Sequence, residues 1–246
     1  MSRGDRPVVL ITGASRGIGA AVAELLAREG YRLALTYRSD EGAARTVARN
    51  VQDAGGDVEI LQADMAEPEE AARLIDLIGT KFGRLDHLVA NAGIADDGAF
   101  LTFDEDRIQR TLATNLSGNI RLVCAAMPVM EQGGGSSIVL MSSLGGIYGG
   151  DGQVPYCASK GGLIGLMQMM SPALAERGIS INAVAPGYIE TDMTSNISVE
   201  RIRPFLKFSA SGRMGHVEEI ARVVRFLLHP GYINSTTIRC DGGFGR

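Results

Sequence analysis

Several features that would assign this chain to a class of protein are missing from its sequence. No apolar run approaches the roughly 20 residues that a helix needs to span a bilayer. The N-terminal segment passes from Arg3 and Arg6 directly into a short apolar run that resembles a strand. The formal net charge of −4 leaves no basic excess for nucleic acid or for an anionic membrane surface. We therefore expect a soluble, cytoplasmic protein with no nucleic-acid partner and no membrane partner.

Metal and disulfide chemistry is also poorly represented. The 3 cysteines, Cys124, Cys157 and Cys240, are far apart and form no CxxC pair, and the 3 histidines have no metal-ligand spacing. Cys157 directly follows Tyr156, but a reduced, packed side chain is the simplest interpretation of an isolated cysteine. We predict that the protein has no metal site.

Short aliphatic runs alternate with longer helical patterns along the whole chain. With 246 residues, 45% of them hydrophobic, residues 1–246 can bury one sizeable core but leave little room for two independent domains. The alternation predicts an α/β fold, a single doubly wound Rossmann domain with a seven-stranded parallel sheet flanked by helices. The expected strands are 8–12, 32–37, 58–62, 87–90, 137–142, 180–185 and 236–239. The expected helices are 17–29, 41–54, 67–82, 104–131, 156–177 and 216–229.

One segment interrupts this alternation. The stretch from Pro186 to Gly215 is long for a connection, and long connections in compact domains are often functional. Its apolar residues could cover a substrate, so that about 188–215 would form a lid. A surface helix pair packed on the sheet is the other interpretation, and both remain open at this point. The apolar residues concerned are Met193, Ile197, Ile202, Phe205, Leu206 and Phe208.

A glycine-rich turn directly follows the first expected strand. The segment reads TGASRGIG at 12–19 and opens a helix rich in alanine and leucine. Glycines let the backbone turn sharply and approach a pyrophosphate, and the helix N-terminus offers free N–H groups with a partial positive charge. We therefore predict a dinucleotide site in this turn. Its members are Gly13, Ser15, Arg16, Gly17, Ile18 and Gly19.

The end of the second expected strand indicates which dinucleotide binds. An acidic residue there would accept hydrogen bonds from the adenosine ribose hydroxyls of NAD, but the chain reads LTYRS at 35–39. Arg38 and Arg16 could instead hold a 2′-phosphate by charge-assisted hydrogen bonds. We therefore predict NADP as the cofactor. In the alternative, Arg38 is a solvated surface residue and Asp40 is the ribose partner.

Two further strand ends extend the predicted cofactor site. Asp64, followed by Met65, could accept a hydrogen bond from the adenine amino group, or it could be the N-cap of the next helix. After the fourth expected strand, the small residues of Asn91-Ala92-Gly93 would let the backbone pass close to the cofactor while the asparagine braces the sheet. We add these five residues to the predicted cofactor site.

Tyr156 and Lys160 form the candidate catalytic pair. They are four residues apart at the start of an expected helix, so both side chains rise from one face. A phenol ordinarily titrates near pH ~10, and a neighbouring ammonium favours the phenolate and lowers the pKa toward neutrality. Lys160 could also hold the nicotinamide ribose. We predict that Tyr156 is the proton donor, whereas an ordinary packed pair is the alternative.

Ser143 and Asn115 complete the candidate site. Ser143 follows the fifth expected strand, where its hydroxyl could donate to a carbonyl oxygen as negative charge develops; a plain turn residue is the alternative. Ser142 should point to the opposite side if the strand continues that far. Asn115 lies within an expected helix, an unfavourable place for asparagine. It could open the helix locally and anchor a water that leads to Lys160, or it could be a polar surface residue.

Taken together, these motifs resemble the short-chain dehydrogenase/reductase family over nearly the whole chain. TGASRGIG at 12–19, NAG at 91–93, YCASK at 156–160 and PG at 186–187 occur in the order and spacing of that family, with Asn115 and Ser143 between them. The resemblance implies a catalytic tetrad of Asn115, Ser143, Tyr156 and Lys160, and commonly a homotetramer. Glycines 161, 162 and 165 would permit close packing of the catalytic helix. The resemblance also implies cofactor contacts from Tyr156, Lys160, Pro186, Gly187, Ile189 and Thr191.

Within this family, the chain is most similar to the 3-oxoacyl-acyl-carrier-protein reductases. GDGQ at 150–153, RGI at 177–179 and APGYIETDMT at 185–194 carry this resemblance, and Arg177 matches a basic carrier-docking position. It implies the NADPH-dependent reduction of a 3-oxoacyl thioester to a secondary alcohol in fatty acid biosynthesis. The segment MEQGGGSS at 130–137 lacks the basic residues usual in that group, which is unfavourable for docking an acyl carrier protein. The alternatives are an NADP-linked alcohol, polyol or polyketide ketoreductase without a carrier, and a non-catalytic dinucleotide-binding protein.

Overall fold

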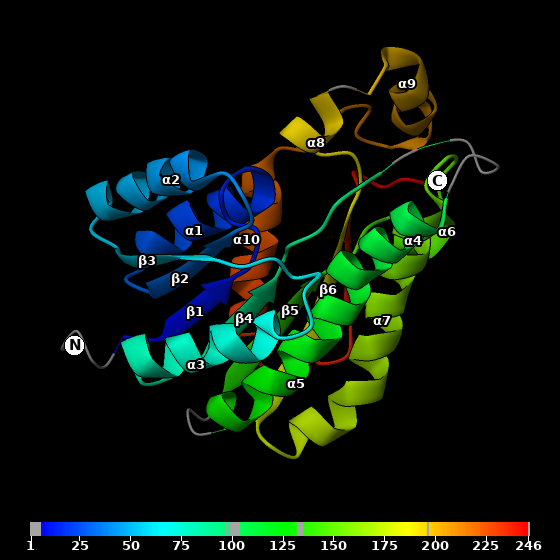
Figure 1. Ribbon diagram of the computed structural model, residues 1–246. Helices are drawn as coiled ribbons and strands as arrows, with labels where there is room; N and C mark the ends of the chain where they lie inside the picture. Colours follow the sequence, from blue (N-terminus) through cyan, green and yellow to red (C-terminus); the bar gives the residue numbers. More distant parts are fainter. Residues whose placement is uncertain (1–5, 97, 99–103, 132–134, 196, 246) are drawn as a thin grey trace.

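A seven-stranded parallel sheet forms the centre of the computed structural model, which describes residues 6–96, 98, 104–131, 135–195 and 197–245. The strand order is β3-β2-β1-β4-β5-β6-β7, and every neighbouring pair is parallel (Figure 1). Because the order reverses between β1 and β4, the topology is doubly wound, as predicted. The seven predicted strands are confirmed to within one residue at each end. They are β1 (Val8–Ile11), β2 (Arg32–Tyr37), β3 (Asp57–Gln62), β4 (His87–Ala90), β5 (Ser136–Met141), β6 (Ile179–Pro186) and β7 (Thr237–Cys240).

Helices cover both faces of the sheet, because successive side chains of a strand point to opposite faces. In β1, Val9 belongs to one buried cluster and Leu10 to the other. The cluster of Val9 includes α1 (Gly17–Ala27), α2 (Glu41–Asp53) and α10 (Val217–Leu228), whereas that of Leu10 includes α3 (Glu70–Phe82), α5 (Gly118–Met130) and α7 (Val154–Ala175).

No helix within the described ranges has both the length and the apolar composition to cross a membrane.

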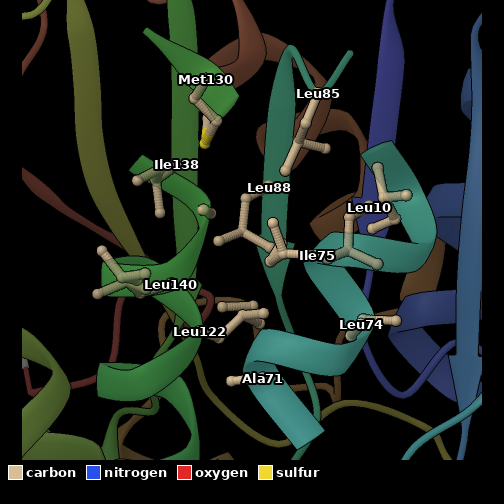
Figure 2. Packing of buried hydrophobic residues seen from close by; sticks show 14 of the residues in the cluster. Leu10, Ala71, Leu74, Ile75, Leu85, Leu88, Leu122, Met130, Ile138 and Leu140 are labelled. Atoms are coloured by element: carbon tan, nitrogen blue, oxygen red, sulfur yellow. The ribbon is translucent and has the colours of Figure 1, made fainter. Parts of the chain in front are cut away.

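Figure 2 shows the core between the sheet and helices α3 and α5. Leu10, Leu88 and Leu140 come from three different strands and gather with Leu74 of α3 and Leu122 of α5. All five side chains are fully buried. Burial of each leucine contributes roughly 1.5–3 kcal/mol, so this layer holds the strands rigidly beneath the edge where the predicted site residues lie.

The predicted helix 104–131 is wrong as one continuous element. The structure divides it into α4 (Glu105–Leu112), a π-helical turn at Ala113–Ser117 and α5. Asn115 lies in that turn, so the local opening that we expected of the helix is confirmed. Single π-helical turns inside α-helices are frequently found at functional sites.

The long connection after β6 contains two short helices, α8 (Asp192–Ser195) and α9 (Val199–Phe208). It leaves and returns at one point, because Ile189 and Gly215 form an isolated β-bridge and the Gly215 N–H donates to the Tyr188 carbonyl at 2.9 Å. Neither helix belongs to the buried clusters on the sheet faces, and both project beyond the carboxyl edge of the sheet (Figure 1). This position differs from that of a helix pair packed on the sheet. The lid function of 188–215 stays a prediction.

Candidate active site

A cleft of about 360 Å³ lies at the carboxyl end of the sheet, where the strand order reverses. Crevices at this position of doubly wound sheets are where ligands bind. The lining comes from the glycine-rich turn, from the ends of β2, β3 and β4, and from the segment after β6. Of the residues predicted to bind the cofactor, the cleft is lined by Gly13, Ser15, Arg16, Gly17, Ile18, Arg38, Asp64, Met65, Asn91, Ala92, Gly93 and Thr191.

The glycine-rich turn has the geometry that phosphate binding requires. Gly17 adopts a left-handed φ of 57°, and α1 begins at this residue. The preceding residue, Arg16, makes no side-chain cap hydrogen bond, so the first N–H groups of α1 are not capped by it. Such N–H groups attract anions. Gly19 is buried, and an added Cβ would lie 2.5 Å from the Gly13 carbonyl oxygen, so this glycine permits close packing and does not line the cleft.

Asn91 joins β4 to the glycine-rich turn, which is the bracing role that we predicted. Its Nδ2 donates to the carbonyl oxygens of Thr12 and Gly13 at 2.9 and 3.0 Å. In return, the Thr12 hydroxyl oxygen accepts hydrogen bonds from the N–H groups of Asn91 and Ala92, both at 3.0 Å. A cofactor contact by Asn91 stays a prediction.

Arg16 and Arg38 line the same cleft but differ in their partners. One Arg16 nitrogen lies 2.7 Å from Asp40 Oδ2 and another lies 3.6 Å from Asp192 Oδ2, whereas no hydrogen bond or ion pair is found for the Arg38 guanidinium among the described residues. Asp40 also accepts a hydrogen bond from Ala43 N–H as the N-cap of α2. Because Asp40 already has both partners, this arrangement is unfavourable for a ribose contact by Asp40.

Asp64 lies in the cleft, and one of its two predicted interpretations is wrong. Helix α3 begins at Glu70 with Glu69 as its N-cap, so Asp64 is not a helix cap. Its Oδ1 accepts from Ala66 N–H at 3.0 Å in the turn after β3. Contact with adenine stays a prediction.

Lys160 is buried beside Tyr156, as the helical spacing predicts. Its Nζ lies 5.7 Å from the centre of the Tyr156 ring and donates to the Met141 carbonyl oxygen at 2.7 Å. Burial lowers the pKa of Lys160 from 10.5 to about 8, because a charged ammonium is poorly solvated there. The ammonium is therefore mostly charged at neutral pH but loses its proton within the mildly alkaline range.

Asn115 is fully buried, so the surface interpretation of this residue is wrong. Its Oδ1 accepts from Ile94 N–H, and its Nδ2 donates to the Ile94 carbonyl oxygen, both at 2.8 Å. The same Nδ2 donates to Ser159 Oγ at 3.1 Å. The side chain thus ties the segment after β4 to helix α7. The predicted water between Asn115 and Lys160 stays a prediction.

Ser143 and Tyr156 approach the same point next to Gly145. A Cβ placed on Gly145 would lie 3.6 Å from Ser143 Oγ and 3.9 Å from Cε1 of Tyr156. Ser143 Oγ accepts from Gly145 N–H at 3.1 Å, which leaves its own O–H available as a donor. Ser142 lies beyond the end of β5, so the condition on which we expected it to point away from Ser143 is not met. Its buried hydroxyl donates to the Lys160 carbonyl oxygen on α7 at 2.8 Å.

The remaining predicted residues after β6 occupy different surroundings. Pro186 is the last residue of β6, and Gly187 follows it beside Phe205. Ile189 is 5% exposed and packs in the cluster of α1 and α10, so its side chain does not face a cofactor site, and its carbonyl oxygen accepts from Thr194 Oγ1 at 2.6 Å. Metal-ligating side chains form no group of three or more in the part of the chain that the structure describes.

Sequence reasoning missed two supporting residues. Ser159 is buried, donates to the Tyr156 carbonyl oxygen at 2.6 Å and accepts from Asn115. Thr36 accepts from Gly13 N–H at 3.1 Å through its hydroxyl, which holds the glycine-rich turn against β2. Both residues adjoin motifs that we did recognise, but the bond from Asn115 to Ser159 and the bond from Gly13 to Thr36 each join chain segments more than 20 residues apart.

Comparison with known proteins agrees with this geometry. A family model described as "Enoyl-(Acyl carrier protein) reductase" matches residues 13–245. The 3-oxoacyl-[acyl-carrier-protein] reductases of Synechocystis sp. and Homo sapiens are both 38% identical to this chain, over 239 and 236 residues; these regions cover 96% of this chain in each case, and 96% and 97% of the relatives. A short chain dehydrogenase from Burkholderia cenocepacia, solved in complex with NADP, has a TM-score of 0.91 and 34% identity, covering 98% of this chain and 97% of that chain.

Proposed function

Because the chain belongs to the short-chain dehydrogenase/reductase family, we propose that it reduces a ketone to a secondary alcohol with NADPH. The ketone that the relatives support best is a 3-oxoacyl thioester, since the similar proteins from Synechocystis sp. and Homo sapiens are named 3-oxoacyl-[acyl-carrier-protein] reductases. The observation that carries the proposal is the convergence of Ser143 Oγ and the Tyr156 ring beside Gly145, with Lys160 buried next to the ring.

In this proposal, the chain's own residues bind the carbonyl oxygen and supply a proton. NADPH, when bound, supplies the hydride that adds to the carbonyl carbon. Ser143 and Tyr156 donate hydrogen bonds to the carbonyl oxygen as it gains negative charge, and Tyr156 then transfers its proton to that oxygen. The Lys160 ammonium favours the phenolate that this transfer leaves on Tyr156. Asn115 holds the segment after β4 in position and leads a water toward Lys160.

NADP is the cofactor that the residues of the cleft fit. The start of α1, which has no side-chain cap from Arg16, suits a pyrophosphate. The Arg38 guanidinium, which has no partner among the described residues, suits the additional 2′-phosphate. Arg16 would contribute to the same phosphate, exchanging its solvent-exposed contacts with Asp40 and Asp192. The NADP complex of the Burkholderia cenocepacia relative supports this choice.

A ketone substrate without a carrier protein is the second candidate, and one ion pair favours it. Arg177, the residue at the carrier-docking position, lies 2.5 Å from Glu131, measured from Nε to Oε1. Its charge is therefore compensated within the chain. An acidic carrier would gain little attraction from such a pair, because charge complementarity across an interface requires an uncompensated opposite charge.

A substrate panel distinguishes these possibilities. Acetoacetyl-acyl-carrier-protein, acetoacetyl-N-acetylcysteamine, a crotonyl thioester, simple ketones and sugars are each assayed with NADPH and with NADH. We expect acetoacetyl thioesters to be reduced with NADPH, and the crotonyl thioester, which has a C=C bond in place of the ketone, to be inert. A KM for the carrier-bound ester equal to that of the small thioester would support the carrier-free candidate. Reduction of crotonyl alone would overturn the proposal.

Tyr156→Phe tests the assigned proton donor. Removal of one donor to a developing oxyanion lowers turnover by roughly 10²–10³-fold, and the variant should still bind NADPH. Tyr232→Phe is the matched control, because Tyr232 is fully exposed. Full turnover in Tyr156→Phe would contradict the assignment, and loss of NADPH oxidation in Tyr156→Phe alone would exclude a non-catalytic dinucleotide-binding protein.

We also propose a homotetramer, as the family resemblance implies. Exposed Ile120 on α5 and Met169 on α7 support an apolar contact by these helices. Gly165 has open space where a Cβ would be, but Gly161 and Gly162 pack inside the chain against Gly146 and Leu116. The predicted close packing against a partner is therefore available only at Gly165. Light scattering coupled to size-exclusion chromatography measures the assembly.

A further inference from the structure

Four aromatic rings form one continuous row at the carboxyl end of the sheet. The chain has no tryptophan, 7 phenylalanines and 6 tyrosines, so aromatic rings are scarce. Tyr188 meets Phe205 edge-on at 4.9 Å between ring centres, Phe205 stacks on Phe244 at 5.1 Å, and Phe244 meets Tyr148 edge-on at 5.9 Å. The rings come from the start of the long connection, from α9, from the C-terminal segment and from α6 (Gly145–Tyr148).

This row reaches from the proposed cofactor segment to the catalytic hydroxyls. Phe205 lies against Gly187, where an added Cβ would be 2.8 Å from Cζ of the ring. Tyr148 is at the other end of the row, three residues after Gly145 on the same short helix, and Gly145 is the residue beside Ser143 Oγ. Figure 1 shows the C-terminal end of the chain next to α6 and α9, consistent with these contacts. The row therefore borders the place where the ketone would bind.

Arg239 holds Tyr148 in place although that side chain is 54% exposed. Its Nη1 donates to the Tyr148 hydroxyl at 2.6 Å, and its guanidinium carbon lies 5.0 Å from the centre of the ring. Its Nη2 donates to the Phe244 carbonyl oxygen. Asp241, which is buried, accepts from Arg239 Nε at 2.7 Å and compensates the charge. The result is an ordered aromatic surface without net charge, which needs little reorganisation to bind an apolar group.

Exposed apolar side chains also occur on segments that carry this row or adjoin it in the chain. Among the described residues, the exposed large apolar side chains include five on α6, the start of α7, α8 and α9. The five residues are Ile147, Tyr148, Val154, Met193 and Phe208.

We infer that the ketone substrate carries a hydrocarbon chain that packs against Tyr148 and Phe244, and that Tyr148 is a specificity-determining residue. This inference rests on the proposed ketone reduction and adds the class of substrate. A hydrocarbon chain fits because the surface is apolar and because its cation, Arg239, is already paired with Asp241. A substrate with a free carboxylate or phosphate at this position would find no uncompensated charge in the row.

The test compares 3-oxoacyl-N-acetylcysteamine thioesters with acyl chains of 4 and 10 carbons on wild type, Tyr148→Ala and Tyr148→Phe. Each buried methylene is worth up to about fourfold in affinity, so we expect the wild-type kcat/KM to rise at least tenfold from the short to the long ester. Tyr148→Ala should lower that ratio about fivefold or more, through KM of the long ester. Tyr148→Phe keeps the ring and should preserve the ratio. Tyr232→Ala, at an exposed tyrosine outside the row, is the matched control.

A binding measurement without turnover accompanies these assays. Calorimetry with 3-hydroxydecanoyl-N-acetylcysteamine should show weaker binding to Tyr148→Ala than to wild type, and equal melting temperatures should verify that the variant is folded. A wild-type enzyme that reduces both esters equally, or a Tyr148→Ala variant that keeps the wild-type ratio, would overturn the inference while leaving ketone reduction intact. Loss of subunit assembly in Tyr148→Ala without loss of chain-length preference would overturn it as well. Failure to reduce either ester would contradict the proposed function itself.

Discussion

Raising the pH through the pKa of Lys160 should slow ketone reduction and, over the same range, stabilise the fold. The perturbation acts on one buried ammonium, whose pKa burial lowers from 10.5 to about 8. For a group with a pKa of about 8, roughly 90% carries the charge at pH 7 and roughly 10% at pH 9. Because the charged form favours proton release by Tyr156, we expect kcat/KM for the free enzyme to fall about tenfold between pH 7 and pH 9.

The sign of the stability effect is opposite to that of the effect on the rate. Between pH 8 and pH 10.5 the unfolded chain keeps a proton on Lys160 that the folded chain has lost, so the free energy of unfolding rises with pH over this range. The full difference between the two pKa values corresponds to about 3 kcal/mol. Cys240, whose pKa burial raises to about 11, titrates in the opposite sense. The comparison is therefore made between wild type and Lys160→Met.

Urea unfolding followed by circular dichroism at pH 7.5, 9 and 10 measures the stability, and initial rates at the same pH values measure the activity. Lys160→Met should remove the part of the rise in unfolding free energy with pH that comes from Lys160, and it should reduce turnover at every pH. Lys81→Met, at an exposed residue on α3 that pairs with Glu59, should change neither the pH dependence of the unfolding free energy nor that of the rate. If the unfolding free energy changed with pH equally in wild type and Lys160→Met, the argument would be refuted, because the buried ammonium would then contribute nothing to the pH dependence.

Three other predictions follow from single sites. Arg38→Ala should weaken NADPH binding by roughly 10- to 150-fold, since a charge-assisted hydrogen bond is worth roughly 1.5–3 kcal/mol, and should leave NADH binding unchanged in calorimetry. Burial and the neighbouring His229 lower the pKa of His87 to about 4, so the free energy of unfolding should fall by up to about 3 kcal/mol as the pH falls from 6.5 to 4. In His87→Leu, urea unfolding at several pH values should show a smaller loss of stability over this range. Asn115→Leu should destabilise the fold by roughly 3–6 kcal/mol, because Ile94 and Ser159 lose buried partners. Asn50→Leu, at an exposed asparagine, serves as its control in urea unfolding.

The strands and the glycine-rich turn could be predicted because their signals are local. Each strand is a short apolar run bounded by turn residues, and the seven runs fall within one residue of the observed strands. Gly17 has a left-handed φ of 57° in a turn whose glycine spacing is legible from the sequence alone. Such signals depend on neighbouring residues in the chain, which is why reasoning from one sequence recovers them.

The interruption of the helix at 113–117 could be anticipated only in part. Asn115 indicated that something had to open the helix, but the form of the opening depends on distant groups. Its amide binds Ile94 after β4 and Ser159 on α7, and a Cβ on Gly118 would meet the Met65 carbonyl oxygen at 2.1 Å. These contacts involve three segments that are distant in the chain. A π-helical turn that depends on them cannot be predicted from the helical pattern of 104–131.

The same distinction explains why the proximity of Tyr156 and Lys160 could be predicted and the aromatic row could not. Tyr156 and Lys160 lie one helical turn apart, so their meeting depends on the geometry of a single helix. The row needs Tyr148, Phe205 and Phe244 from three segments, and only the return of the C-terminal segment to α6 brings them together. The chemistry of the site is thus local in the chain, whereas the surface that would choose the substrate is assembled by tertiary structure. Relatives that share the YCASK motif can therefore differ in substrate without any change in that motif.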